Sequence, residues 1–314
     1  MRSKIIYLVL FALFLSSCDT GHLGRRWLPK VPKGAEAVSV SGEPLYRTDP
    51  TPSVQERYNR AREEWKADSD NADKIIWYGR WTAYTGRYRD AIRVFAEGIR
   101  KNPSDARMLR HRGHRYISIR EFNRATDDLE KAALMMAFEP DEIEPDGMPN
   151  SLNIPVSTLK SNIFYHLGLA WYLEGDKEKA LDAWTDDISL SVNDDMKVAT
   201  LHWVYMTLRE LGREEEALAA LEPVNSDMYI IENQAYHKLC LFYKGEIAIE
   251  ELTGEDYSDI MNDAMLYGLG NWYLYQENDT ATAREYFNRI FKGGSWASFG
   301  YIAAEVKLPE LTGE

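Results

Sequence analysis

Residues 75–103 read IIWYGRWTAYTGRYRDAIRVFAEGIRKNP, a stretch in which apolar and small residues recur at helical spacing on both sides of a glycine. Residues 109–129, LRHRGHRYISIREFNRATDDL, repeat the same order of large, small and aromatic positions. Ala91 in the first stretch corresponds to Ala125 in the second, so the period is 34 residues. A fixed period of this length predicts an array of helix pairs, each of which buries its apolar face against its neighbours. Distant units of such an array are expected to touch little.

Further copies of the pattern continue to about residue 292. Small residues at matching positions allow the two helices of a pair to approach closely, and large residues around them fill the gaps to the next pair. Gly86, Gly175 and Gly212 stand where the turn between the paired helices belongs. The third copy is as clear as the first two, the fourth is good, and the last two are degenerate. The alanines that mark the six units are Ala91, Ala125, Ala180, Ala217, Ala248 and Ala283.

Over roughly residues 72–292 the pattern resembles the tetratricopeptide repeat (TPR) family, whose unit combines a large residue, a Leu-Gly pair and an aromatic residue with a later Ala, aromatic residue and Pro. The resemblance implies an all-α, right-handed superhelical solenoid of about six antiparallel helix pairs. Residues 54–65 carry one apolar stripe, which predicts an additional helix before the first pair. A last stripe at residues 295–308 predicts a capping helix, which a solenoid needs at its end.

The N-terminus has the features of an export signal. The unbroken apolar run Ile5–Leu15 would span about 16 Å as a helix, which is too short for a bilayer core of about 30 Å. We therefore interpret residues 1–17 as a signal peptide. The sequence LSSC at 15–18 resembles the lipobox of bacterial lipoproteins, which implies that Cys18 is acylated and anchors the chain in the bacterial cell envelope. The alternative is ordinary secretory cleavage beside an incidental cysteine.

The remainder of the chain divides by composition. Residues 18–52 are rich in proline and glycine and show no helical periodicity, so we predict an extended tether, with packing of part of it along the array as the alternative. Residues 53–308 are assigned to the array. The wider spacing between the second and third units places a proline-rich, acidic loop insertion at about residues 138–160. Residues 309–314 are predicted to be a polar tail.

Composition and motifs argue against enzymatic and nucleic-acid functions. The chain has 50 acidic and 37 basic residues, and its net charge of −13 disfavours general binding to nucleic acid. It contains no GxSxG elbow, glycine-rich phosphate loop or HExxH motif. His111 and His114 have the spacing of zinc ligands but stand among arginines, and Cys240 near His237 is expected in a packed helix, where cysteine acts as a small hydrophobe. We predict no catalytic residue, metal or cofactor.

The resemblance implies that the first helix of each pair lines the concave side of the solenoid. The residues predicted for the groove include no aspartate or glutamate, and the nearest acidic residue, Asp73, lies at its first edge, so the sign of the acidic chain is locally reversed. An arginine guanidinium can donate two hydrogen bonds to one carboxylate, and aromatic side chains provide contact area. We therefore predict an acidic peptide or protein as the partner. Histidines in this groove are expected to tighten binding from pH 8 to pH 6. The predicted groove residues are Arg80, Arg107, Arg110, His114, Tyr165, Tyr172, His202, Arg209, Asn233, His237, Trp272 and Tyr275.

The sequence therefore favours an envelope-anchored scaffold or adaptor for protein–protein interaction, and it leaves alternatives open. In one, the groove side chains form ion pairs with acidic neighbours on adjacent repeats and bind no partner. In another, the acidic insertion is the contact surface. In a third, the chain is a glycan- or nutrient-binding lipoprotein that works with an outer-membrane transporter, although lipoproteins of that kind are much longer.

Overall fold

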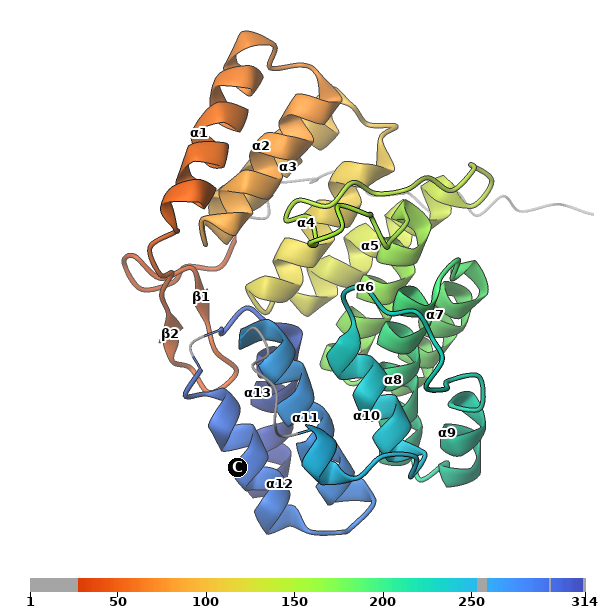
Figure 1. Ribbon diagram of the computed structural model, residues 1–314. Coiled ribbons are helices and arrows are strands. Elements are labelled where there is room, and N and C mark those ends of the chain that lie inside the picture. The colour runs from red at the N-terminus through yellow and green to blue at the C-terminus, as the bar shows by residue number, and fades with distance from the viewer. Residues whose placement is uncertain (1–27, 253–258, 294, 313–314) are drawn as a thin grey trace, which may run out of the picture. The chain divides into compact units, whose positions relative to one another are not determined.

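The computed structural model describes residues 28–252, 259–293 and 295–312, and this part of the chain is almost entirely helical (Figure 1). The predicted signal peptide, Cys18 and the first part of the tether lie outside the described residues. No helix among the described residues has both the length and the apolar character needed to cross a membrane. The helices are α1 (Pro52–Ala67), α2 (Ala72–Tyr84), α3 (Tyr88–Lys101), α4 (Ala106–Ser118), α5 (Phe122–Met136), α6 (Leu159–Glu174), α7 (Lys177–Leu190), α8 (Asp194–Glu210), α9 (Glu214–Ala220), α10 (Gln234–Tyr243), α11 (Asp259–Tyr275), α12 (Thr280–Ile290) and α13 (Phe299–Thr312).

Successive helices form the pairs that the repeat pattern predicts, namely α2–α3, α4–α5, α6–α7, α8–α9 and α11–α12. In the degenerate fifth unit, α10 is followed by a short 3₁₀ helix, η1 (Ile249–Leu252). Helix α1 precedes the first pair, and α13 follows the last as a capping helix. The fold is thus a TPR-like helical repeat solenoid. A residue with positive φ lies in the turn of each unit: Gly86, Arg120, Gly175, Gly212, Gly245 and Asn278.

The small residues of the pattern lie where two helices meet. A Cβ atom at Gly79 would overlap the ring of Phe95, and one at Gly168 would overlap the ring of Trp184. Overpacking of this kind typically costs about 1–3 kcal/mol, so the pattern fixes the approach of the paired helices. Ala248 is the exception, because it lies in the unit whose second helix is only η1, and it is exposed. The other five marker alanines have no exposed surface: Ala91, Ala125, Ala180, Ala217 and Ala283.

The described end of the predicted tether packs on the array. Two short antiparallel strands, β1 (Ala37–Val38) and β2 (Pro44–Leu45), form a small hairpin there. The Glu36 carboxylate accepts a hydrogen bond from the backbone N–H of Arg89 at 3.0 Å, and the carbonyl of Tyr46 accepts one from Trp296 Nε1 at 2.7 Å. This part of the segment therefore packs along the array, which is the alternative to a fully extended tether.

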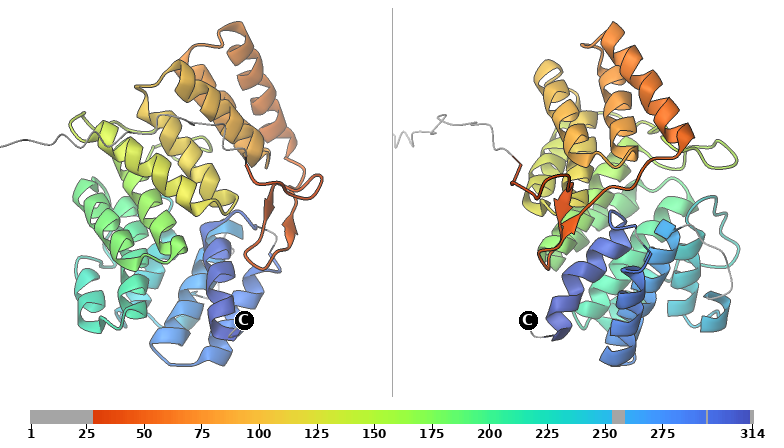
Figure 2. Two further views of the ribbon diagram at one scale, coloured as in Figure 1. Left: turned by 180° about the vertical axis from the view of Figure 1, so that it is seen from behind. Right: turned by 90° about the vertical axis from the view of Figure 1, so that its left-hand side faces the viewer.

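The last helix returns to the early repeats. Helix α13 packs on α11 and α12 and reaches α6 (Figure 2). Arg120 Nε donates to Glu305 Oε2 at 2.8 Å, and only 6 % of each side chain is exposed. Arg120 also donates to the carbonyl oxygen of Trp296 at 2.8 Å. A second buried ion pair joins Lys307 of α13 to Glu210 of α8. Distant units therefore do touch, and the expectation that they touch little is corrected by the return of α13.

Removal of the Glu305 charge should destabilise the contact of α13 with the second repeat, which closes the array. Glu305→Gln leaves the Arg120 guanidinium buried without a counter-charge, and loss of one partner from a buried pair costs about 3–5 kcal/mol. We expect a decrease of that order in the free energy of unfolding measured with urea, and faster amide exchange in α13. Glu310→Gln is the control, because it removes a largely exposed carboxylate of the same helix. Equal losses for the two variants would contradict the role of the pair.

Candidate functional site

Helix α4 brings the basic sequence RHRGHR into the interior of the first repeats. Arg110, His111, His114 and Arg115 line a cavity of about 250 Å³, which lies beside a second cavity of about 430 Å³. The two cavities share parts of their walls, including Tyr84, His114 and Arg115. We call the two together the α4 cleft. Its volume is within the range that small ligands or short peptide segments occupy.

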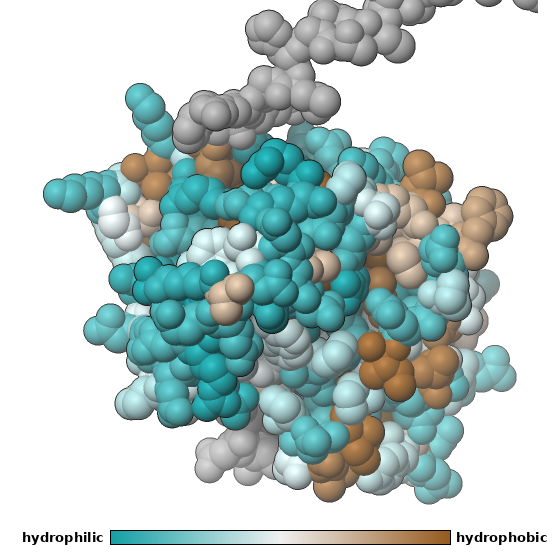
Figure 3. All heavy atoms as spheres, turned by 90° about the horizontal axis from the view of Figure 1, so that it is seen from above, coloured by the Kyte–Doolittle hydropathy of each residue, from teal (hydrophilic) through white to brown (hydrophobic). Residues whose placement is uncertain are grey.

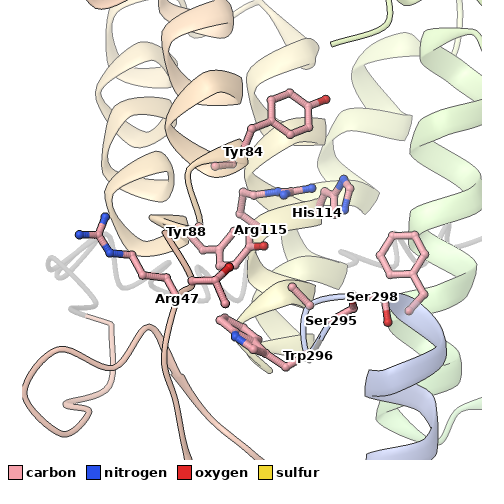
Figure 4. Close-up of a pocket in the computed structure, with 13 residues that line it drawn as sticks. Arg47, Tyr84, Tyr88, His114, Arg115, Ser295, Trp296 and Ser298 are labelled. Atoms are coloured by element: carbon pink, nitrogen blue, oxygen red, sulfur yellow. The ribbon is translucent and has the colours of Figure 1, made fainter. Parts of the chain in front are cut away.

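The larger cavity is closed by segments from both ends of the array (Figure 4). Arg47 comes from the segment before α1, Tyr84 from the end of α2, and Trp296 from the segment that leads into α13. Trp296 meets Tyr88 edge to face, with 5.3 Å between the ring centroids. Aromatic walls of this kind provide a large contact area at a low cost in side-chain entropy.

The Arg115 guanidinium lies in the cleft between Tyr84 and Trp296 (Figure 4). Within the described part of the chain it makes no hydrogen bond and no ion pair. Its Cζ atom lies 5.5 Å from the centroid of the Tyr88 ring. Burial, together with the charges of Arg110 and other arginines, lowers the pKa of Arg115 to about 10, so the side chain remains charged at neutral pH. Arg115 is partly buried, so its charge has lost some of its hydration, and an anionic ligand would compensate for that loss.

In the smaller cavity, by contrast, the arginines have partners from the insertion. Arg110 Nε lies 3.0 Å from Glu144 Oε2, and about one-tenth of each side chain is exposed. Arg80 Nη1 donates to the carbonyl oxygen of Pro145 at 2.7 Å. Arg110 thus forms an ion pair within the chain, and Arg80 forms a hydrogen bond. In both cases the partner belongs to the insertion, whereas the ion-pair alternative expects it on an adjacent repeat.

The histidines of this region are held in the neutral form. Burial lowers the pKa of His111, His114 and His166 well below 6.5, and neighbouring arginines lower it further. Burial alone lowers the pKa of His202 to about 3. The neutral His111 ring can therefore accept a hydrogen bond at Nδ1 from Arg110 Nη1, 3.1 Å away. For His114 and His202, two of the predicted groove histidines, the expectation that the imidazole gains charge and tightens binding between pH 8 and pH 6 is wrong.

Three of the twelve predicted groove residues, Arg80, Arg110 and His114, line the cleft. The array does not present an open groove along all six first helices, because its C-terminal half closes on itself. The hydroxyl groups of Tyr172 and Tyr267, for example, are hydrogen-bonded at 2.6 Å in the interior. The nine predicted residues that do not line the cleft are Arg107, Tyr165, Tyr172, His202, Arg209, Asn233, His237, Trp272 and Tyr275.

Several of these nine residues have polar partners within the chain, whereas His202 Nε2 and Arg209 Nε are buried without a hydrogen-bond partner among the described residues. Arg107 pairs with Asp73 of the preceding unit at 2.8 Å, as the ion-pair alternative anticipates. Arg209 donates to the carbonyl oxygen of Tyr275 at 2.9 Å, and His237 Nε2 donates to a backbone carbonyl at 2.8 Å. These side chains stabilise the contacts between units and are not free to meet a partner in this conformation.

The cysteine and the histidine considered for catalysis and for zinc binding lie in the interior of the array. Cys240 is completely buried, and burial strongly raises the pKa of its thiol. His111 Nε2 lies 3.9 Å from Glu144 Oε1, beside Arg110. Over the described ranges, no three His, Cys, Asp or Glu side chains are grouped as a metal ion requires.

The side chains of the cleft that sequence reasoning missed include Tyr84, Arg115, His166 and Trp296. Arg115 lies directly after the predicted inward residue His114, and the concentration of arginines around it was the available signal. Trp296 could not be placed from the pattern, because its position depends on the return of the chain after α12.

The buried imidazoles should not titrate in the neutral range. We expect the Cε1–H signals of His114 and His166 to stay unchanged from pH 8 to pH 5 in NMR spectra, because burial disfavours the charged form. The His114→Gln variant assigns the first signal. A histidine-containing peptide in the same buffer is the reference and should titrate near pH 6.5. A midpoint above pH 6 for either protein signal would contradict the structure.

No family model and no curated protein matches the chain. Solved structures of similar fold include MamA, with 17 % identity, a TM-score of 0.43, and coverage of 62 % of this chain and 90 % of that one. YrrB, a TPR protein with an unusual peptide-binding site, is 17 % identical, with a TM-score of 0.41 and coverage of 77 % and 95 %. A TPR protein from Parabacteroides merdae is 10 % identical, with a TM-score of 0.48 and coverage of 81 % and 92 %. These likenesses concern the fold alone, and no residue of the chain takes a role from them.

Proposed function

We propose that the protein is a lipid-anchored scaffold or adaptor of the bacterial cell envelope, without chemistry of its own, that binds an acidic segment of a protein or peptide in the α4 cleft. The observation that carries the proposal is the position of Arg115. Its guanidinium is charged, partly buried and without an ion pair among the described residues, and it lies in a cavity with aromatic walls. A carboxylate is the group that such a fork binds best, because two N–H groups can donate to it together.

The surface around the array supports recognition of a polar rather than an apolar partner. Seen from above, the molecule is mostly hydrophilic, and its apolar residues form separate patches rather than one continuous area (Figure 3). Large apolar docking faces of soluble proteins are contiguous. Selectivity is therefore expected from charge and shape within the cleft.

Anchoring through Cys18 can be tested separately from binding. Cys18→Ser should move the protein from the membrane fraction to the soluble fraction with an unchanged circular dichroism spectrum, because the attachment depends on burial of acyl chains. Cys240→Ala is the matched control, since it removes a buried cysteine of the array and should leave the protein in the membrane fraction. A Cys18→Ser variant that still sediments with membranes after a high-salt wash would sink the lipoprotein hypothesis.

Binding should depend on the Arg115 charge. The immobilised protein is used to capture proteins from detergent-solubilised envelopes, and mass spectrometry quantifies them. We expect Arg115→Glu to reduce capture of an acidic partner at least about tenfold, because loss of one charged hydrogen-bonding group costs about 1.5–3 kcal/mol. Arg60→Glu makes the same charge change on the exposed face of α1 and should leave capture unchanged.

Two outcomes of this experiment would overturn the proposed function. One is undiminished capture by a folded Arg115→Glu variant. The other is retention of the wild-type protein on a polysaccharide column without capture of any protein, which would favour the glycan-binding alternative.

A further inference from the structure

The acidic insertion enters the α4 cleft in the manner of a ligand. The Glu144 carboxylate lies 3.0 Å from Arg110 Nε, and the next carbonyl along the chain, that of Pro145, accepts a hydrogen bond from Arg80 at 2.7 Å. Asp146, two residues after Glu144, has a buried carboxylate oxygen in the same region. The Glu144 carboxylate and the Pro145 carbonyl thus meet basic side chains of α4 and α2, and the Asp146 carboxylate lies within the electrostatic influence of Arg80.

The backbone of the insertion is shaped to reach this position. The N–H of Glu144 donates to the carbonyl of Ser157 at 3.0 Å, and Ile143 pairs with Thr158 in an isolated antiparallel bridge. Gly147 is buried against Tyr84, and a Cβ atom at this position would overlap the Tyr84 hydroxyl. A side chain at position 147 therefore requires Tyr84 to move from its observed position.

The fit of this segment is incomplete. Arg110 Nε and Glu144 Oε2 are close, yet neither atom makes an aligned hydrogen bond. Asp146 Oδ2 is buried without a hydrogen-bond partner, and Glu232 and Glu144 are acidic neighbours of this carboxylate. Arg115, which lines both cavities, has no ion pair with an acidic side chain of the insertion. Buried polar groups left without partners weaken the docking, so another acidic segment with better geometry would bind more favourably.

We propose that residues 143–148, Ile-Glu-Pro-Asp-Gly-Met, are an internal ligand of the α4 cleft, and that the partner carries a segment of the same chemistry. That partner segment has two carboxylates at positions i and i+2 and a small residue after the second one, and it displaces the insertion when it binds. This inference rests on the proposed function. It specifies the chemical class of the partner and identifies residues 143–148 as the segment that restricts access to the cleft.

The test uses a synthetic peptide with the sequence of residues 140–150, PDEIEPDGMPN, labelled with a fluorophore. Its affinity is measured by fluorescence anisotropy against the full mature protein and against Gly147→Val. The substitution removes no charge and leaves the basic side chains intact, but its side chain overlaps Tyr84 and disfavours docking of the insertion. We expect Gly147→Val to bind the peptide at least about tenfold more tightly than the wild type, because a larger fraction of the protein has the cleft open.

Controls separate docking from unfolding and from nonspecific attraction. Glu142→Gln removes an exposed acidic side chain of the same loop and should leave the affinity unchanged. A peptide with Gln at position 144 and Asn at position 146 should not bind Gly147→Val. The double variant Glu144→Gln with Asp146→Asn opens the cleft by a second route, in case Gly147→Val perturbs the fold. If neither opened variant binds the peptide while both keep the wild-type circular dichroism spectrum, the internal-ligand proposal falls.

The two proposals fail in different ways. If Arg115→Glu abolishes capture of the envelope partner but opening the insertion leaves peptide affinity unchanged, the cleft is the binding site and the insertion is not its internal ligand. If the opened variants bind the peptide but Arg115→Glu captures the partner as the wild type does, the internal ligand stands and the proposed partner site does not.

Discussion

The buried ion pair between Arg120 and Glu305 is the interaction on which the closure of the array depends. Arg120 occupies a turn where φ is 65°, a conformation that favours glycine and costs a side-chain-bearing residue roughly 1–2 kcal/mol. The guanidinium donates to Glu305 and also to the carbonyl oxygens of Ser118 and Trp296. These bonds hold the segment before α13 against the second repeat. Because Trp296 forms a wall of the α4 cleft, the larger cavity exists only while this contact is made.

Dense positive charge in the cleft is compatible with folding because the neighbouring histidines stay neutral. His111, His114 and His166 lie among arginines, and each would add to the repulsion if it were charged. Their rings instead pack together, as His114 and His166 do with 4.3 Å between centroids. Arg115 is a cation of the larger cavity for which the described residues provide no ion pair, and it can therefore attract an anion there.

Much of the fold could be predicted from the sequence because its causes are local. Gly79 faces Phe95 and Gly168 faces Trp184 within single repeats, so their spacing alone indicates the helix pairs and their close approach. The cleft could be predicted only in part. Its arginines and His114 belong to a periodic helix, but the contact of Glu144 with Arg110 depends on how a nonperiodic insertion folds back. The inward side chains of the C-terminal half, such as Tyr172, are buried by contacts that no local pattern encodes.

The insertion is attached at both ends, to α5 and to α6, and this attachment has a consequence for selectivity. A segment held so close to its binding site has an effective concentration on the order of millimolar. A small carboxylate or phosphate that binds no more tightly than the insertion must therefore reach a comparable concentration to displace it. A successful competitor has to add contacts that Glu144 and Asp146 do not make, and the Arg115 cavity provides them. The loop would thereby set a minimum size for the ligand, since a molecule that fills only one of the two cavities gains too little to replace it.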